Sequence, residues 1–256
     1  ATLIVIAGPL QPISANEATL IADYLAGGGS LIVLSESPFM TQTLGATDPL
    51  ADYLASEWGI TLSNDIVIDT TAQDPLIAVS AIHASHPITE ALQTTVTFYP
   101  TSRSLLVAGG SSEDISTTVL VTTAQQSWGE TDIDSFSVGE VEYTSGSDTL
   151  GPLNIAVAAQ NMSTEARLVV IGDSEFASDT FFDQYGNGDM IINAIDWAAQ
   201  VENMVTLTAA ADPIERTLKP TTQTVVLLLG AAFICIIPLL IIVGGVASWL
   251  VRRSQG

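Results

Sequence analysis

The feature that most constrains this chain is an uncharged apolar run near its C-terminal end. Residues 225–251 read VVLLLGAAFICIIPLLIIVGGVASWLV, which is 27 residues without a charged side chain. About 20 apolar residues in a helix span a bilayer core, and buried helices of soluble domains seldom stay apolar on every face for so long. We therefore predict a single transmembrane helix over residues 225–251, followed by a tail of residues 252–256 in the cytoplasm.

Several residues of this run suit an anchor in the lipid bilayer. A proline inside a helix removes one backbone hydrogen bond, and glycines let a neighbouring helix approach closely. Tryptophan marks the membrane interface, and arginine after it favours the cytoplasmic side. The predicted anchor residues are Pro238, Gly244, Gly245, Trp249, Arg252 and Arg253.

The chain before this run is strongly acidic. Residues 1–215 hold all 28 Asp and Glu side chains but only two basic ones, Arg103 and Arg167, which gives a formal net charge of −26. Such a surface repels the phosphate backbone of a nucleic acid. The only lysine is Lys219, so the chain contains no G-x-x-x-x-G-K-[ST] phosphate-binding loop. We therefore expect this chain to bind neither nucleic acid nor nucleotide.

No set of catalytic residues is complete in residues 1–215. The single cysteine, Cys235, lies in the apolar run, so no cysteine nucleophile or cysteine zinc site is available there. Gly172-Asp173-Ser174 matches three letters of the GDS-type esterases, but no histidine follows His86 to act as the base. His83 and His86 lack the further ligands of a metal motif. We predict a protein that is not an enzyme and holds no metal or cofactor.

Apolar β-rich runs alternate with helical patterns over the first 70 residues. Strands are predicted at residues 2–7, 30–34 and 65–69. One helix follows the capping-box pattern that begins at Ser14, and a second follows Asp48, with proline at its first position. This alternation predicts an α/β domain with a doubly wound, mostly parallel sheet.

The later segments complete this domain. Their predicted strands lie at residues 94–98, 105–108, 117–122, 154–160 and 167–171, and the last helix at about 188–200. Residues 124–150 are polar, acidic and rich in Gly and Ser, which predicts a surface insertion. We divide the chain into a domain of residues 1–202 with this insertion, a Thr-rich stalk of residues 203–224, and the membrane helix.

Polar residues follow three of the predicted strands. In doubly wound sheets, ligands bind in a crevice beyond the carboxyl ends of the strands. The residues at these positions are Gly8, Pro9, Ser35, Glu36 and Asp173. They form the predicted crevice of a ligand-binding module, although for Gly8-Pro9 a simple turn is the favoured interpretation.

Several stretches resemble, in their order and spacing, the auxiliary proteins of ABC-type transport systems, the group that includes the gliding-motility auxiliary GldG. The resemblance rests on stretches from the first strand to the last helix, among them Leu3–Pro9, Tyr24–Leu34, Ser127–Glu130, Arg167–Ser174 and Gly186–Trp197. It implies an extracytoplasmic domain with a flavodoxin-like or glutamine-amidotransferase-like fold. The amidotransferase chemistry does not carry over, because residues 1–215 contain no cysteine.

The resemblance also implies partners. It suggests a membrane-anchored accessory subunit of an ABC-2-like exporter that works beside a separate permease and ATPase, with its acidic domain contacting a partner or cargo outside the cytoplasm. A scaffold of a respiratory or photosynthetic complex and an extracytoplasmic ligand-binding module are the alternatives. The chain opens at Ala1 directly into a strand pattern, so we expect a signal peptide or a further membrane helix ahead of it.

Overall fold

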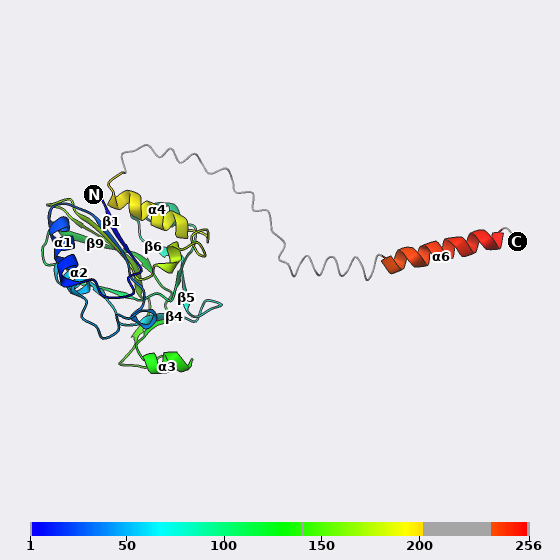
Figure 1. Ribbon diagram of the computed structural model, residues 1–256, viewed down its shortest axis with the longest axis horizontal. Coiled ribbons are helices and arrows are strands. Elements are labelled where there is room, and N and C mark those ends of the chain that lie inside the picture. The colour runs from blue at the N-terminus through cyan, green and yellow to red at the C-terminus, as the bar shows by residue number, and fades with distance from the viewer. Residues whose placement is uncertain (1, 140, 202–236, 255–256) are drawn as a thin grey trace. The chain divides into compact units, whose positions relative to one another are not determined.

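The computed structural model describes residues 2–139, 141–201 and 237–254 (Figure 1). The chain divides into a unit of residues 1–204 and a unit of residues 205–256, and each is described here by itself. The first unit holds nearly all of the strands and helices, and the second contributes one described helix.

The main sheet of the first unit is mixed. Its strands follow the order β1-β2-β13-β12-β8-β3, while β9 pairs with β12 and β6 pairs with β9. β1, β2 and β13 are parallel to one another, and the remaining pairs are antiparallel. The strands are β1 (Ile4–Ala7), β2 (Leu31–Leu34), β3 (Ile60–Leu62), β6 (Ile82–His83), β8 (Leu105–Val107), β9 (Ile115–Thr122), β12 (Asn154–Asn161) and β13 (Arg167–Ile171).

The helices that cover this sheet begin where the sequence predicts. α1 (Ala15–Ala26) has the predicted capping box, in which the Ser14 side chain accepts from the Glu17 N–H and the Glu17 carboxylate accepts from the Ser14 N–H. α2 (Pro49–Trp58) starts after Asp48, whose carboxylate accepts two N–H bonds of the first turn, and ends at Gly59 in the left-handed region. α4 (Asn187–Ala198) is the predicted last helix.

The two faces of the sheet carry separate cores. Leu31 and Val33 of β2 pack in one cluster with α1 and α2, whereas Ile32 and Leu34 pack in the other with α4. This alternation follows from the strand geometry, in which successive side chains point to opposite faces. The parallel strands β2 and β13 are therefore buried from both sides, as in a doubly wound fold.

The prediction of an α/β domain is confirmed, but the prediction of a mostly parallel sheet is wrong. β12 and β13 are joined only by residues 162–166, and a connection this short reverses the chain direction. The predicted strand at residues 65–69 is present as β4 (Ile66–Asp69), but it pairs with β10 in a second sheet.

Two small sheets lie beside the main one. The first has the order β11 (Thr149–Leu150), β10 (Ser127–Glu130) and β4, and the second pairs β5 (Ile77–Ser80) with β7 (Thr97–Pro100). β10, the short helix α3 (Ile133–Val138) and β11 all come from the predicted surface insertion. That segment is therefore more ordered than its composition suggests, because Trp128 of β10 is buried against Ile66 and Ile68 of β4.

The three short 3-10 helices complete the described elements of the first unit, and they are η1 (Pro38–Met40), η2 (Glu90–Leu92) and η3 (Glu175–Ala177). η1 and η3 directly follow the ends of β2 and β13. Both therefore begin at the edge of the sheet where the predicted crevice lies.

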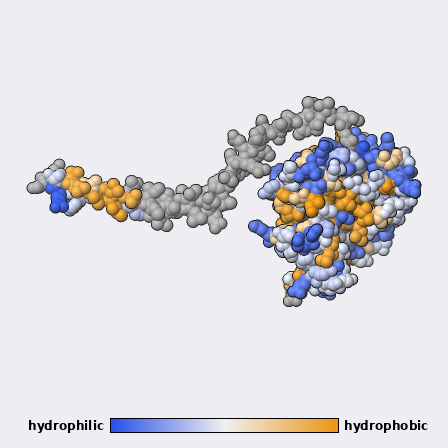
Figure 2. All heavy atoms as spheres, turned by 180° about the vertical axis from the view of Figure 1, so that it is seen from behind, coloured by the Kyte–Doolittle hydropathy of each residue, from blue (hydrophilic) through white to orange (hydrophobic). Residues whose placement is uncertain are grey.

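The second unit contributes α6 (Ile237–Ser254), which contains the later part of the predicted membrane run. Figure 2 shows α6 as hydrophobic over most of its length and hydrophilic at its C-terminal end, where Arg252 and Arg253 lie. No helix among the described residues is long and apolar enough to cross a membrane. Residues 225–236 of the predicted membrane helix and the predicted stalk of residues 203–224 lie outside the described residues.

Candidate functional site

The five predicted crevice residues lie at one edge of the main sheet, where β1, β2 and β13 end. The Gly8 N–H donates to the Leu34 carbonyl at 2.9 Å, and the Ser35 N–H donates to the Ile171 carbonyl at 2.9 Å. These bonds continue the parallel ladder beyond the strands and hold the three chain ends side by side. The structure thus brings together the residues that the sequence places there, and their role in binding stays a prediction.

Glu36 is the buried carboxyl group of this edge, with 8% of its surface exposed. The Ser174 N–H donates to Glu36 Oε1 at 2.6 Å, and the Ser174 hydroxyl donates to the same oxygen. Burial raises the pKa of Glu36, while the hydrogen bonds from Ser174 act in the opposite direction. Ser174 is therefore hydrogen-bonded to a carboxyl group, and no local sequence pattern predicts this contact because 138 positions separate the two residues.

Asp173 is fully buried next to this pair. Its Oδ1 accepts from the Glu175 N–H at 2.7 Å, but its Oδ2 has no hydrogen-bond partner. Burial, followed by the negative charge of Glu36, raises the pKa of Asp173 well above its ordinary value. Both causes oppose the ionisation of Asp173 in the folded protein.

Arg103 is a further candidate site residue at this edge, and the sequence did not predict it as one. It is 5% exposed, and its Nε donates to the Ser63 carbonyl at 2.8 Å. Its Nη1 donates to Ser35 Oγ at 3.3 Å and to the Glu36 carbonyl at 3.4 Å. Burial lowers the pKa of Arg103 to about 10, so the guanidinium remains charged at neutral pH. A single arginine between serines carries no motif, and only the scarcity of basic residues in an acidic domain could have drawn attention to it.

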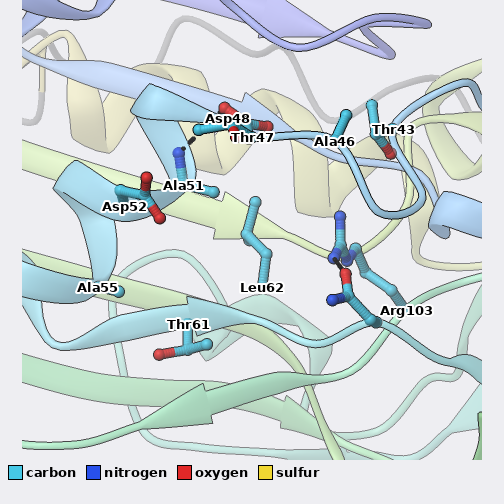
Figure 3. A pocket seen from close by; sticks show the side chains of 11 residues that line it. Thr43, Ala46, Thr47, Asp48, Ala51, Asp52, Ala55, Thr61, Leu62 and Arg103 are labelled. Atoms are coloured by element: carbon cyan, nitrogen blue, oxygen red, sulfur yellow. Dashed lines mark hydrogen bonds between the residues drawn. The ribbon is translucent and has the colours of Figure 1, made fainter.

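Arg103 also forms one wall of a hollow beside the edge. The hollow has a volume of about 420 Å³ and lies between the loop before α2, the side of α2, and β3 (Figure 3). Its other lining residues include Thr43, Asp48, Asp52 and Leu62. None of the five predicted crevice residues lines this hollow.

The turn that follows β1 lies close to the segment that follows β13. Gly8 has a φ of +59°, and a Cβ atom placed on it would lie 2.6 Å from Ser174 Oγ. Glycine is therefore required at this position by backbone conformation and by space. The observed geometry is that of a tight turn, which was one of the two interpretations of Gly8-Pro9.

We expect Gly8→Ala to lower the free energy of unfolding by about 1–2 kcal/mol, the usual cost of a left-handed conformation for an L-residue. Urea denaturation of the variant measures this loss. Ser174→Ala removes the hydroxyl that the new methyl group would meet. The double variant should therefore lose less than the two single variants together, and strict additivity would contradict the proposed contact.

The groups at this edge that can bind or donate protons are the carboxyl groups of Glu36 and Asp173 and the Ser174 hydroxyl. The Ser174 hydroxyl is bonded to Glu36, while the two histidines lie in other contacts, His83 with Thr97 and His86 with the Trp197 ring. Within the described ranges, no three His, Cys, Asp or Glu side chains are placed to hold a metal ion. The arrangement that is present is a pair of buried carboxyl groups with one bonded serine.

Comparisons with known proteins bear on the whole chain. The family model described as "ABC-type uncharacterized transport system" matches residues 1–194. No curated protein matches the chain. Among solved structures, the chain is similar to the "mmIFT52 N-terminal domain", with 19% identity, a TM-score of 0.57 and 77% of each chain covered. It is also similar to a ThuA-like protein from Bacteroides uniformis ATCC 8492, with 15% identity, a TM-score of 0.44, and 77% of this chain and 69% of that chain covered. The likeness to the first structure shows the α/β fold alone.

Proposed function

This chain belongs to the ABC-type transport system auxiliary family, and on that basis we propose that it is a non-enzymatic, membrane-anchored accessory subunit of an ABC-2-like transport complex. The family match carries the proposal, because it extends over residues 1–194 and so includes every element of the main sheet. A separate permease and a separate ATPase are the proposed partners.

Membrane anchoring is supported by the C-terminal sequence. The apolar run of residues 225–251 is long enough for a bilayer, and it ends in Trp249 before Arg252 and Arg253. The Arg253 guanidinium lies over the Trp249 ring at 5.1 Å, a pairing suited to the membrane interface. We place the C-terminus in the cytoplasm and the acidic domain outside it.

The absence of catalysis is supported by the sheet edge. The candidate nucleophile Ser174 donates a hydrogen bond from its hydroxyl group to Glu36. In the described structure, no histidine lies beside it. A Cβ atom placed on Gly8 would lie 2.6 Å from the same hydroxyl, so the turn after β1 lies close to it. The proposal therefore assigns contacts with a partner or cargo to the domain, and ATP hydrolysis to another subunit.

Purification of the native protein in a mild detergent tests this proposal. We expect a permease and an ATPase to remain bound and to be identified by mass spectrometry, and we expect the protein in the membrane fraction before extraction. A matched variant that lacks residues 225–256 should leave the membrane fraction and lose the permease.

Other outcomes would contradict the proposal. Recovery of a respiratory or photosynthetic complex would favour a scaffold role, and recovery of the chain alone would leave only the family relationship. Hydrolysis of ATP or an ester by the purified chain, abolished by Ser174→Ala, would show an enzyme instead.

A further inference from the structure

The outer edge of β1 is an open edge of the main sheet. β1 pairs with β2 on one side, and no strand in the described part of the chain pairs with it on the other. The Ile4 N–H donates to the Ser30 carbonyl and the Gly8 N–H to the Leu34 carbonyl, both at 2.9 Å. Because backbone groups alternate in direction along a strand, the N–H and C=O groups of Val5 and Ala7 point away from β2.

The side chains of β1 are also less covered than those of its neighbours. All four residues of β2 are buried, whereas Val5 is 46% exposed and Ala7 is exposed as well. Natural sheets usually protect an open edge with lysine, proline or a bulge. Ile4–Ala7 contains no charge and no proline, and its register with β2 is regular. The edge is therefore unprotected against another strand.

An apolar flank of α4 extends this edge. Ile192 and Ile195 of α4 are 48% and 38% exposed. The opposite flank of the helix faces η2, because the Asn193 side chain donates to the Ile88 carbonyl at 3.0 Å. Ile192 and Ile195 therefore lie on the flank of α4 that is turned away from η2.

The C-terminal end of α4 lies beside the start of β1. Thr2, just before β1, and Ala199, just after α4, line the same hollow, which has a volume of about 410 Å³. Leu3 packs against the core cluster that contains α4, so the odd-numbered residues of this segment share the α4 face of the sheet. The exposed residues of these two neighbouring elements, Val5 and Ala7 of β1 and Ile192 and Ile195 of α4, are called here the β1 edge surface.

The charges around the β1 edge surface indicate which kind of partner could bind there. Asp189 and Asp196 are exposed on α4, and each is three or four positions from Ile192, on the same side of the helix. Residues 1–215 carry a formal net charge of −26, so a second copy of this chain would be repelled. Basic side chains would instead find acidic neighbours.

We propose that the β1 edge surface binds an extended segment of a partner polypeptide, which adds to β1 as a strand and carries both apolar and basic residues. The outward backbone groups require an extended chain, the exposed isoleucines favour apolar residues in it, and the acidic border favours Lys or Arg. This inference stands independently of the transport assignment, since it concerns only the described domain.

A synthetic peptide tests the proposal on the full chain in a mild detergent. The probe is an end-blocked peptide of eight residues that alternates valine and lysine, and its controls replace lysine by glutamate or one central valine by proline. We expect the Val–Lys peptide to bind at least about tenfold more tightly than either control, a difference of about 1.4 kcal/mol. Hydrogen exchange measured by NMR should slow at the Val5 and Ala7 amides.

Variants of the chain locate the contact. Ile192→Lys combined with Ile195→Lys should weaken binding about tenfold, because the occupant is basic. Val138→Lys is the matched control, since Val138 is 70% exposed on α3, outside the β1 edge surface. Val5→Pro removes one outward N–H, and its far-ultraviolet circular dichroism should match that of the unmodified chain while binding is lost.

Three results would overturn the proposal. The first is the absence of binding, or binding that leaves the exchange of Val5 and Ala7 unchanged. The second is slow exchange of these two amides in the free monomeric chain, which would mean that the edge is already filled. The third is a dimer that protects the same amides, which would assign the surface to a second copy.

Discussion

Arg103→Met is expected to lower the free energy of unfolding by about 3–5 kcal/mol, the range observed when one partner of a buried charge pair is removed and the other charge stays buried. The guanidinium connects the segment after β2 with the segment before β4, since it donates to Ser35, Glu36 and Ser63. Methionine fills the volume but leaves these acceptors without donors. Asp65 would also lose a positive neighbour while it stays buried.

Urea denaturation followed by tryptophan fluorescence measures this loss, and the chain offers its own control. Arg167, the other basic side chain of residues 1–215, is half-buried, and it donates to the Trp197 carbonyl at 2.6 Å and lies 4.8 Å above the Trp197 ring. Arg167→Met should therefore cost less. Arg103→Lys keeps the charge but not the fork of donors, so it should recover only part of the stability. A loss below about 1 kcal/mol for Arg103→Met would contradict this account.

Local signals explain why much of the fold could be predicted from the sequence. Helix starts are set by neighbouring residues, and both Ser14 with Glu17 and Asp48 with Pro49 act as predicted. The direction of pairing depends on contacts between distant segments. The local pattern of residues 66–69 does not indicate that they pair with residues 127–130 instead of with a strand of the main sheet. The main sheet was therefore predicted with too much parallel pairing, with β4 wrongly included and without β3 and β6.

The candidate site was predictable to a similar depth. Residues that follow parallel strands meet at one edge for geometric reasons, so Gly8, Ser35, Glu36 and Asp173 could be placed together without a structure. The contacts that decide what this edge can do are long-range. Ser174 reaches Glu36, and the space at Gly8 is closed by the same hydroxyl. The strand pattern predicts a crevice at this edge. Whether the crevice is open or filled depends on long-range packing, which the sequence pattern does not indicate.

Asp173→Asn is expected to raise the free energy of unfolding by about 2–3 kcal/mol at neutral pH, because a buried acid with an unpaired oxygen, whose ionisation burial opposes, is replaced by a neutral amide. The effect should depend on pH. The pKa of Asp173 is raised in the folded protein, first by burial and then by Glu36, so the folded state retains a proton that the unfolded state releases. Stability from this group is fully present below the unfolded pKa, about 3.9, and is lost as pH rises through the folded pKa.

The gain from Asp173→Asn should therefore be largest at neutral pH and should shrink toward zero as pH falls to about 4. Urea denaturation of both proteins at several pH values measures this difference, in which the general repulsion among the other carboxylates cancels. Asp69→Asn is the matched control. Asp69 is also fully buried, but its carboxylate accepts from Thr71 N at 2.9 Å, Thr71 Oγ1 at 2.6 Å and Val79 N at 3.2 Å. Its replacement should destabilise at neutral pH, because an amide offers fewer acceptors to these donors. If the two variants changed stability in the same direction, the unpaired oxygen of Asp173 would not be the cause.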